Sequence, residues 1–282
     1  MNLLNLKNRI RSVKNIGQAT KAMELVAASK MRKAQQRSIE AKRFSEELNK
    51  LMISTTHGLD TTEFDLLKQN KSQKKLLIII GPSKGSVGPL ISNLAKEVYK
   101  FLQINPDTDL ISIDKKGNYI AQRSGKKVIS SLNEVKTTIQ EYEIEPIIEI
   151  IKDGYIKLQY SSIHIIYSHF INTLNQKAKL VDLLPIMIEE NNKSVSEDIL
   201  IEPNKRQVIE QLLNKYLDNK LFICILNSIS SEYSARMIAM KNASDNAKDL
   251  KEDLTQEYNQ SRQAAITQQI LEIAGAVTAM GS

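Results

Sequence analysis

Hydrophobic side chains in the first 57 residues recur at alternating intervals of three and four positions. This spacing gives a helix one narrow apolar stripe and is typical of a coiled-coil seam. The seam is rich in small side chains, and Glu24 interrupts it. Its members are Leu3, Leu6, Ile10, Val13, Gly17, Thr20, Ala27, Met31, Ala34, Ala41 and Leu48. We therefore predict one long helix that ends near His57-Gly58, where a glycine suits the left-handed position after a helix.

The last part of the chain, from Asn204 onward, shows a similar spacing. All six prolines lie between Pro82 and Pro203, so neither end segment contains one. Because proline costs about 3 kcal/mol in a helix interior, both end segments can form long unbroken helices. Asn204 is suited to cap the second helix. The second seam is formed by Ile229, Tyr233, Met237, Met240, Ala247, Leu254, Tyr258 and Ala265.

The middle of the chain has a different pattern, in which short apolar runs alternate with helical periodicity. A polar linker is expected over residues 59–74. Strands are then predicted at Lys75–Ile80, Asp109–Ile113, Lys127–Ser130, Ser162–Phe170 and Lys179–Ile188, and helices at Leu90–Leu102, Gly117–Gln122 and Pro146–Tyr160. Strands that alternate with helices predict a small α/β domain with a mostly parallel sheet.

Composition narrows the possible functions. Aromatic residues make up only 5% of the chain and tryptophan is absent, so a large aromatic-lined pocket is not expected. The single Cys224 excludes an internal disulfide and a multi-cysteine metal site. Residues 1–43 contain eleven Lys and Arg against Glu24 and Glu40, within a net charge of +7. A solvated basic face, a nucleic-acid surface and a surface for an acidic protein all fit this asymmetry. No apolar run is long enough for a membrane span.

Candidate chemical sites are few. The segment Gly81–Gly88 follows a predicted strand and precedes a helix, as a phosphate-binding loop would. Its order Lys84-Gly85-Ser86 does not match the Walker pattern, so a tight structural turn is favoured. The histidines stand apart in the sequence, and no nucleophile has a matching base. The sequence therefore predicts no catalytic residue, no cofactor-binding residue and no metal ligand. The isolated histidines are His57, His164 and His169.

Both ends of the chain resemble a known family. Residues 6–35 are similar to the N-terminal helix of the gamma subunit of F-type ATP synthase, and residues 232–280 to its C-terminal helix. The turn at Ser83–Leu90 stands where that family has a glycine-rich turn. The resemblance implies an α/β fold with a long antiparallel coiled coil of the two terminal helices and a small Rossmann-like domain. The expected divisions are 1–58 for the first helix, 59–203 for the Rossmann-like domain and 204–282 for the second helix.

The resemblance also implies a function. A gamma subunit is a non-catalytic rotor in the central stalk, and it couples c-ring rotation to conformational cycling of the catalytic beta subunits for ATP synthesis. The implied partners are a ring of alpha and beta subunits, an epsilon subunit and the c-ring, with one copy per complex and without nucleic acid. The implied location is the cytoplasmic side of a bacterial inner membrane, through partners, or the matrix side if the chain is organelle-encoded.

Several residues match positions that the family uses for contact. Glu202 matches the foot region that meets the c-ring and epsilon; an ordinary exposed carboxylate is the alternative. Met23 could instead be a core methionine, and Arg236 could instead pair with Glu24 across the coiled coil. The positions implied to contact or couple with the alpha-beta ring are Met23, Arg236, Gln263, Thr267 and Glu272.

The chain departs from the family pattern at four positions. Gln269 stands where the family usually has glutamate and Ala276 where it usually has glycine, so coupling through that glutamate charge is not expected here. Ser83 replaces the usual acidic residue of the turn, and Pro89 replaces a glycine. Two other hypotheses remain open: a basic coiled-coil protein that binds nucleic acid, and a nucleotide-binding enzyme that uses the loop at Gly81–Gly88.

Overall fold

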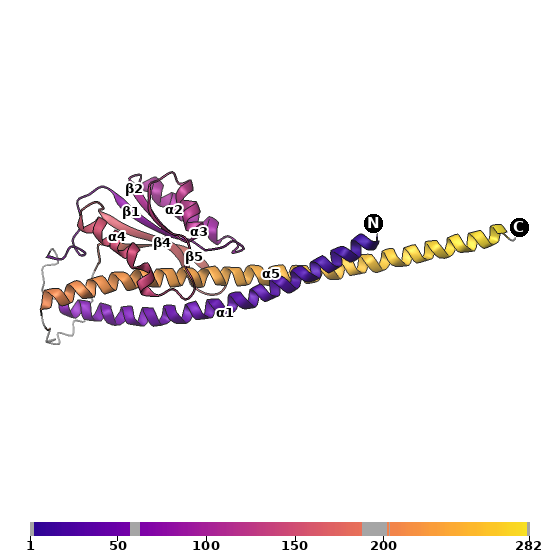
Figure 1. Cartoon of the computed structure of the whole chain (residues 1–282), viewed down its shortest axis with the longest axis horizontal. Coiled ribbons are helices and arrows are strands. Elements are labelled where there is room, and N and C mark those ends of the chain that lie inside the picture. The colour runs from indigo at the N-terminus through magenta and orange to yellow at the C-terminus, as the bar shows by residue number, and fades with distance from the viewer. Residues whose placement is uncertain (1–2, 57–62, 188–201, 203, 281–282) are drawn as a thin grey trace. The chain divides into compact units, whose positions relative to one another are not determined.

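The computed structural model describes residues 3–56, 63–187, 202 and 204–280, so the predicted helix end at His57-Gly58 lies outside the described residues. Two long helices, α1 (Leu3–Thr56) and α5 (Lys205–Met280), precede and follow the α/β elements in the sequence (Figure 1). Asn204 caps α5 as predicted, because its side-chain oxygen accepts a hydrogen bond from the Arg206 amide at 2.9 Å. No helix among the described residues has an apolar stretch long enough to cross a bilayer.

The chain divides into two compact units, and each contains a part of both long helices. One unit is Met1–Ala27 with Met237–Ser282, and the other is Ala28–Arg236. In the first unit the two helices pack closely at Gly17, whose carbonyl accepts a hydrogen bond from the Ser244 hydroxyl at 3.4 Å. A Cβ atom at Gly17 would lie 3.3 Å from that of Ala247, so the small side chains of the predicted seam do allow a close approach.

The second unit holds the other halves of the two helices, and they run antiparallel. Lys30 donates to the Tyr233 hydroxyl at 3.4 Å, and Asn227 donates to the Ser38 hydroxyl at 3.1 Å. Residue numbers thus rise along α1 as they fall along α5. The predicted seam is confirmed, because Ala27, Met31, Ala34, Ala41 and Leu48 of α1 and Ile229, Ala247 and Leu254 of α5 are all buried in their own units.

A five-stranded sheet forms the centre of the second unit. Its strands are β1 (Lys75–Ile80), β2 (Thr108–Ile113), β3 (Val128–Leu132), β4 (Ser162–Phe170) and β5 (Gln176–Leu184). They are arranged in the order β3-β2-β1-β4-β5, and every pair is parallel except β4 with β5. The predicted mostly parallel sheet is confirmed. The last strand was predicted at Lys179–Ile188 and lies earlier, because a short turn in which the Asn175 amide donates to the Asn172 carbonyl brings it straight back from β4.

Helices cover both faces of this sheet (Figure 1). Helices α2 (Leu90–Ile104) and α3 (Lys115–Arg123) pack on one face, against alternate β1 residues Leu77 and Ile79. Helix α4 (Glu145–Ile156), the 3-10 turn η2 (Glu141–Ile144) and the first part of α5 pack on the other face. The helix predicted to reach Tyr160 ends at Ile156, since Leu158 takes a positive φ of 57° that a helix does not allow.

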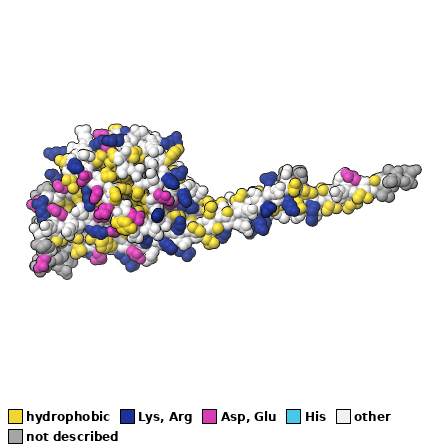
Figure 2. Space-filling view, viewed as in Figure 1, with side chains coloured by type: hydrophobic (Ala, Val, Ile, Leu, Met, Phe, Trp, Pro, Cys, Tyr) yellow, Lys and Arg dark blue, Asp and Glu magenta, His cyan; other side chains and the backbone are white. Residues whose placement is uncertain are grey.

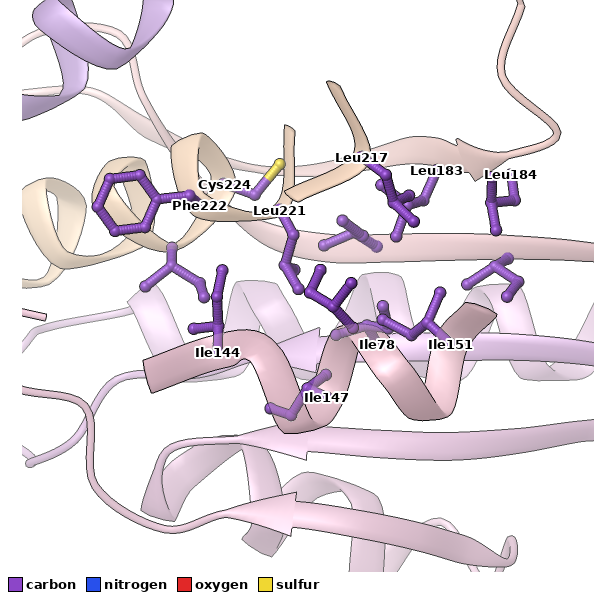
Figure 3. Packing of buried hydrophobic residues seen from close by; sticks show 14 of the residues in the cluster. Ile78, Ile144, Ile147, Ile151, Leu183, Leu184, Leu217, Leu221, Phe222 and Cys224 are labelled. Atoms are coloured by element: carbon purple, nitrogen blue, oxygen red, sulfur yellow. The ribbon is translucent and has the colours of Figure 1, made fainter. Parts of the chain in front are cut away.

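The larger core lies between the sheet, α4 and α5 (Figure 3). Ile78 of β1 and Ile151 of α4 meet Leu217 and Leu221 of α5 there, and all four are buried. Cys224 lies at the same interface, as a buried free thiol. Burial of apolar area stabilises by about 25 cal/mol per Å², so this helix–sheet contact is a main source of stability for the unit. Helix α5 therefore has two apolar faces here, and the sequence analysis identified only the one toward α1.

The segment predicted as a polar linker over residues 59–74 is more than a linker. In its described part, Phe64 and Leu66 are buried in the larger core. The Asn70 amide donates to the carbonyls of Tyr155 at 2.8 Å and Tyr160 at 3.0 Å, which ties the segment to the end of α4. The segment does connect α1 to β1, but it also joins the core, which the sequence did not indicate because two isolated apolar residues in a polar stretch give no periodic signal.

Candidate interaction surfaces and the glycine-rich loop

In the first unit, α1 presents apolar side chains outside its seam. Met23 is 56% exposed, and Ile16 and Val26 near it on the helix surface are exposed to a similar extent. The alternative that Met23 is a core methionine is therefore wrong for this chain. Glu24 lies beside it in the seam and pairs with Lys21 on the same helix, at 3.0 Å. Exposed apolar residues grouped with charged ones are typical of a surface that a partner protein covers.

The second exposed surface of this unit is the end of α5. Gln263, Thr267 and Glu272 all lie exposed on this helix. Glu272 accepts a hydrogen bond from Gln268 of the same helix, at 3.0 Å. Several large apolar side chains are exposed on the same stretch (Figure 2): Ile266, Ile270, Leu271 and Ile273. A helix with apolar side chains exposed around its circumference lacks a covering surface in the described chain.

Glu202 is exposed, two residues before the N-cap of α5. The residues before it, 188–201, and Pro203 after it lie outside the described part of the chain. Glu202 therefore lies just before the start of α5, in the second unit. In the sequence it is well separated from the other candidate contact residues.

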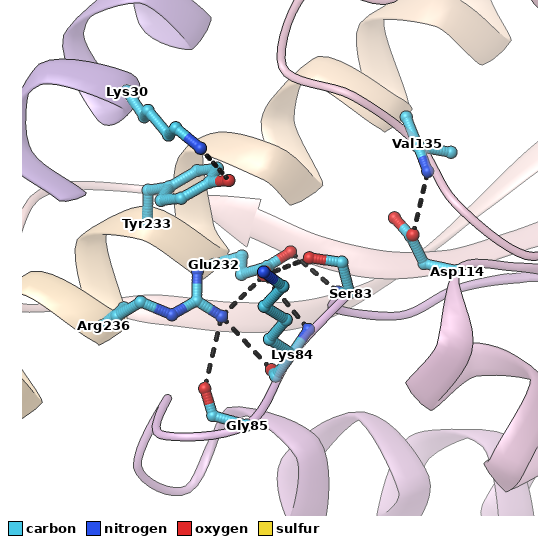
Figure 4. A network of polar contacts seen from close by, with 9 residues as sticks. All are labelled: Lys30, Ser83, Lys84, Gly85, Asp114, Val135, Glu232, Tyr233 and Arg236. Carbon is cyan, nitrogen blue, oxygen red and sulfur yellow. Dashed lines mark hydrogen bonds and ion pairs between the residues drawn. The ribbon is translucent and has the colours of Figure 1, made fainter. Parts of the chain in front are cut away.

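Arg236 belongs to a different arrangement from the exposed residues. It donates to Glu232 of α5 at 2.7 Å and to the carbonyls of Lys84 and Gly85 at 3.2 Å each (Figure 4). Its guanidinium also lies over the Tyr233 ring, 5.1 Å from the ring centre. The side chain is only 13% exposed. The alternative pairing of Arg236 with Glu24 is wrong, because each of these residues pairs within its own helix.

The loop Gly81–Gly88 lies at the carboxyl end of β1 and meets this pair of charges. The Ser83 amide donates to Glu232 Oε2 at 2.9 Å, the Ser83 hydroxyl to Oε1 at 2.8 Å, and the Lys84 amide to Oε1 at 3.4 Å. Glu232 is 3% exposed. The backbone donors that a nucleotide phosphate would need are thus engaged by a side chain of α5. Glu232 was not predicted as a site residue. The only signal for it in the sequence is that one acidic residue stands among the serines of Ser228–Ser234, four residues before an arginine.

Asp114, at the carboxyl end of β2, is the second buried acid in this region (Figure 4). It accepts a hydrogen bond from the Val135 amide at 3.0 Å. Burial raises the pKa of its carboxyl group to about 7, the Val135 hydrogen bond opposes this shift, and the negative charges of Glu232 and Glu134 add to it. This group titrates near neutral pH without an ion-pair partner in the described contacts.

This titration predicts a pH-dependent effect on stability. The pKa of Asp114 is higher in the folded chain than in the unfolded chain. The contribution of Asp114 to the free energy of unfolding is therefore fully present below about pH 4 and is lost as the pH rises to about 7, because the buried carboxyl group then becomes charged. We expect Asp114→Asn to remove this loss and to stabilise the chain by about 4 kcal/mol at pH 8, with little change at pH 4. Urea unfolding at the two pH values measures the difference, and Asp107→Asn, at an exposed site, is the control. An equal effect at both pH values would contradict this explanation.

The histidines of β4 have structural partners. His164 is hydrogen-bonded to Asp182 on β5 at 2.6 Å and to Ser162 at 2.8 Å, and burial lowers its pKa. His169 contacts the Tyr167 hydroxyl at 3.2 Å. The two side chains do not converge on a common site. Among the described residues, no group of three or more His, Cys, Asp or Glu is placed to hold a metal ion.

Comparison with known proteins decides the family. The profile of the ATP synthase family matches residues 2–280. The ATP synthase gamma chain of Methylacidiphilum infernorum is 37% identical over 289 residues, covering 98% of both chains. This chain belongs to the ATP synthase gamma chain family. The gamma chain of Herpetosiphon aurantiacus is also 37% identical, over 98% of this chain and 97% of its own.

Solved structures share the fold at lower identity. The match to the Euglena gracilis mitochondrial ATP synthase, in a structure of OSCP, F1 and the c-ring, has a TM-score of 0.67 at 20% identity and covers 99% of this chain and 94% of that one. The match to the Tetrahymena thermophila mitochondrial enzyme, from its central stalk and c-ring, has a TM-score of 0.61 at 22% identity, with 80% and 99% covered. These solved chains therefore share the fold described here.

Proposed function

We propose that this chain is the central-stalk rotor subunit of a proton-translocating F-type ATP synthase. In this role it couples rotation of the c-ring to conformational cycling of the catalytic beta subunits for ATP synthesis. The observation that carries the proposal is the match to ATP synthase gamma chains over nearly the full length of both sequences. A match of that extent covers both terminal helices as well as the α/β domain, and so includes every element a stalk needs.

The partners follow from the same relationship. The structural relatives come from assemblies described as central stalk with c-ring, and as OSCP, F1 and c-ring. We infer that this chain contacts a ring of alpha and beta subunits, an epsilon subunit and the c-ring, as one copy per complex. It associates with the membrane through these partners, on the cytoplasmic side in a bacterium or the matrix side in an organelle. The chain itself contributes no catalytic residue in this scheme, because the catalytic sites belong to the beta subunits.

The exposed surfaces of the first unit support contact with the ring. The end of α5 exposes Ile266, Ile270 and Ile273 while Glu272 is the one formal charge in the last twenty residues. Such a surface is covered in a stable complex, since large apolar patches on free chains lead to aggregation. We propose that Gln263, Thr267 and Glu272 contact the alpha-beta ring there.

The α1 surface near Met23 differs in chemistry. Met23 and Ile16 are apolar and exposed, and the surrounding residues 1–43 are strongly basic. We propose that this surface faces acidic loops of the beta subunits. Exposed ion pairs are worth only about 0–1 kcal/mol each, so they guide a turning helix without holding it at one angle. In this scheme the partly buried Arg236 contacts the ring less directly, and Glu202 contacts the c-ring or epsilon at the start of α5.

The composition of the complex tests the proposal. A tagged chain is purified from its native membranes and the intact complex is weighed by native mass spectrometry. We expect one copy of this chain with three alpha, three beta and one epsilon subunit. Recovery with nucleic acid, or as a free homodimer, would overturn the proposal and would favour the basic coiled-coil hypothesis.

A further inference from the structure

The glycine-rich loop occupies the position at which open α/β sheets hold their ligands. Strand β1 has β2 on one side and β4 on the other, so the strand order reverses beside β1. Ligands of such sheets lie at this reversal, outside the carboxyl ends of the strands, with an anionic group on the first loop between a strand and a helix. The loop Gly81–Gly88 joins β1 to α2 and is the first such loop of this sheet.

The described structure fills this position with residues of α5. Ser228 donates to the carbonyl of Ile80 at the end of β1 at 3.4 Å, and Ser231 to the carbonyl of Ser168 on β4 at 2.8 Å. Both serines are buried. One turn of α5 thus lies across the ends of β1 and β4, the two strands beside which the strand order reverses.

The anionic group is the carboxylate of Glu232. Ser83 donates to it from both its amide and its hydroxyl, at 2.9 and 2.8 Å, the Lys84 amide donates at 3.4 Å, and Arg236 donates at 2.7 Å (Figure 4). Two backbone amides, one hydroxyl and one guanidinium are the donor types that proteins use for phosphate. Arg236 also donates to the carbonyls of Lys84 and Gly85 in the loop. The loop therefore donates hydrogen bonds to one side chain of α5 and accepts them from another.

We propose that Gly81–Gly88 is an anion-binding loop whose ligand is the Glu232 carboxylate, and that this internal ligand fixes the rotation of α5 about its axis relative to the sheet. The apolar contacts of α5 with the sheet have no directional preference. Hydrogen bonds to a buried carboxylate are directional, and they act at the end of the second unit, since Arg236 is its last residue.

One consequence of this contact rests on the proposed function. If α5 carries torque, the contact of Glu232 with the loop transmits that torque between the helix and the α/β domain. The anion-binding property of the loop does not depend on this consequence. If the chain failed to assemble with alpha and beta subunits, the proposed function would be overturned. The proposal that Glu232 is the anionic ligand of the loop would be unaffected.

Hydrogen–deuterium exchange of the Ser83 and Lys84 amides in the full-length chain tests the proposal. We expect Glu232→Ala to speed exchange of these two amides by roughly tenfold or more, because it removes hydrogen bonds to a charged acceptor. Glu257→Ala, which removes an exposed carboxylate of α5, should leave them unchanged. Sodium acetate, compared with sodium chloride at the same ionic strength, should restore slow exchange in Glu232→Ala by filling the emptied loop, and should have no effect on the wild type.

Two results would overturn the proposal. One is unchanged exchange at Ser83 and Lys84 in Glu232→Ala while the strands remain protected; the other is faster exchange that acetate does not slow more than chloride does. If Glu232→Ala loses protection throughout β1 and β4, the variant is not folded and cannot test the loop. The same measurement on Ser83→Ala then tests the proposal. That variant keeps the carboxylate and removes one donor, so faster exchange at the Lys84 amide supports the proposal and unchanged exchange contradicts it.

Discussion

Gly81→Ala is expected to destabilise the α/β domain by about 3 kcal/mol, the upper end of the usual cost of forcing extra atoms into a packed site. A Cβ atom at this position would lie 2.1 Å from the backbone nitrogen of Gly117 and 2.6 Å from its Cα atom. The obstacle is the backbone of α3, which cannot rotate away as a side chain can. The Gly81 amide is also fixed, because it donates to the Ile113 carbonyl at 3.0 Å.

Urea unfolding of the full chain measures this effect, and Gly85→Ala is the matched control. Gly85 lies in the same loop, and a Cβ atom there would meet no atom within 4 Å. The control should change the free energy of unfolding by no more than about 1 kcal/mol, in either direction. Equal stability of the two variants would show that the approach of the loop to α3 is not as close as described.

Met23→Lys is expected to weaken coupling between proton flow and ATP turnover in the assembled complex, while ATP hydrolysis continues. Met23 is exposed in the free chain, so the substitution should change folding stability by no more than about 0.5 kcal/mol. Its effect arises in the complex, where a new cation near acidic loops would form contacts that hold the helix at one angle. We expect proton pumping per ATP hydrolysed to fall several-fold.

The control for this variant uses the opposite side of the same helix. Leu25 is exposed to a similar extent and lies two residues on, about 200° around the helix axis. Leu25→Lys introduces the same charge and should impair coupling less. Proton pumping and ATP hydrolysis are measured together on membranes that contain each variant. Normal pumping per ATP in Met23→Lys would remove Met23 from the proposed contact surface.

The sequence predicted the long helices and most of the sheet because their signals are local. The run Leu76–Ile80 is continuously apolar and is closed by Gly81-Pro82, and β1 has the predicted bounds, Lys75–Ile80. Strand β4 likewise has the predicted bounds, Ser162–Phe170. Because neither end segment contains proline, the backbone hydrogen bonds of α1 and α5 continue without a break. Each of these patterns lies within a single element and needs no knowledge of distant contacts.

The apolar face of α5 toward the sheet could not be separated from its seam in the same way. Ile209, Leu213 and Leu217 are spaced as a seam would be, but they pack against strands rather than against α1 alone. Periodicity identifies a buried face without identifying what covers it. Phe64 and Leu66 gave no sign of the core that they join, because two isolated apolar residues have no periodicity.

The candidate site was the least predictable part. The sequence identified the loop at Gly81–Gly88 but could not show what engages its donors, because Glu232 lies almost 150 residues later in the chain. It placed Arg236 in a contact role without showing that the loop carbonyls and Glu232 surround it. Residues such as Met23 and Gln263 have no local signal for contact beyond the family resemblance, and both are exposed in the structure.

Rotation of this chain within its complex is tested most directly by observing single complexes. The only native thiol, Cys224, is buried, and burial raises its pKa to about 12, so it is unreactive. A cysteine introduced at the exposed Lys100 of α2 would therefore be the sole labelled thiol of this chain and could carry a visible probe. With the beta subunits fixed to a surface, we expect ATP to drive unidirectional rotation of the probe in steps of a third of a turn. A probe that stays still while the same complexes hydrolyse ATP would contradict the account.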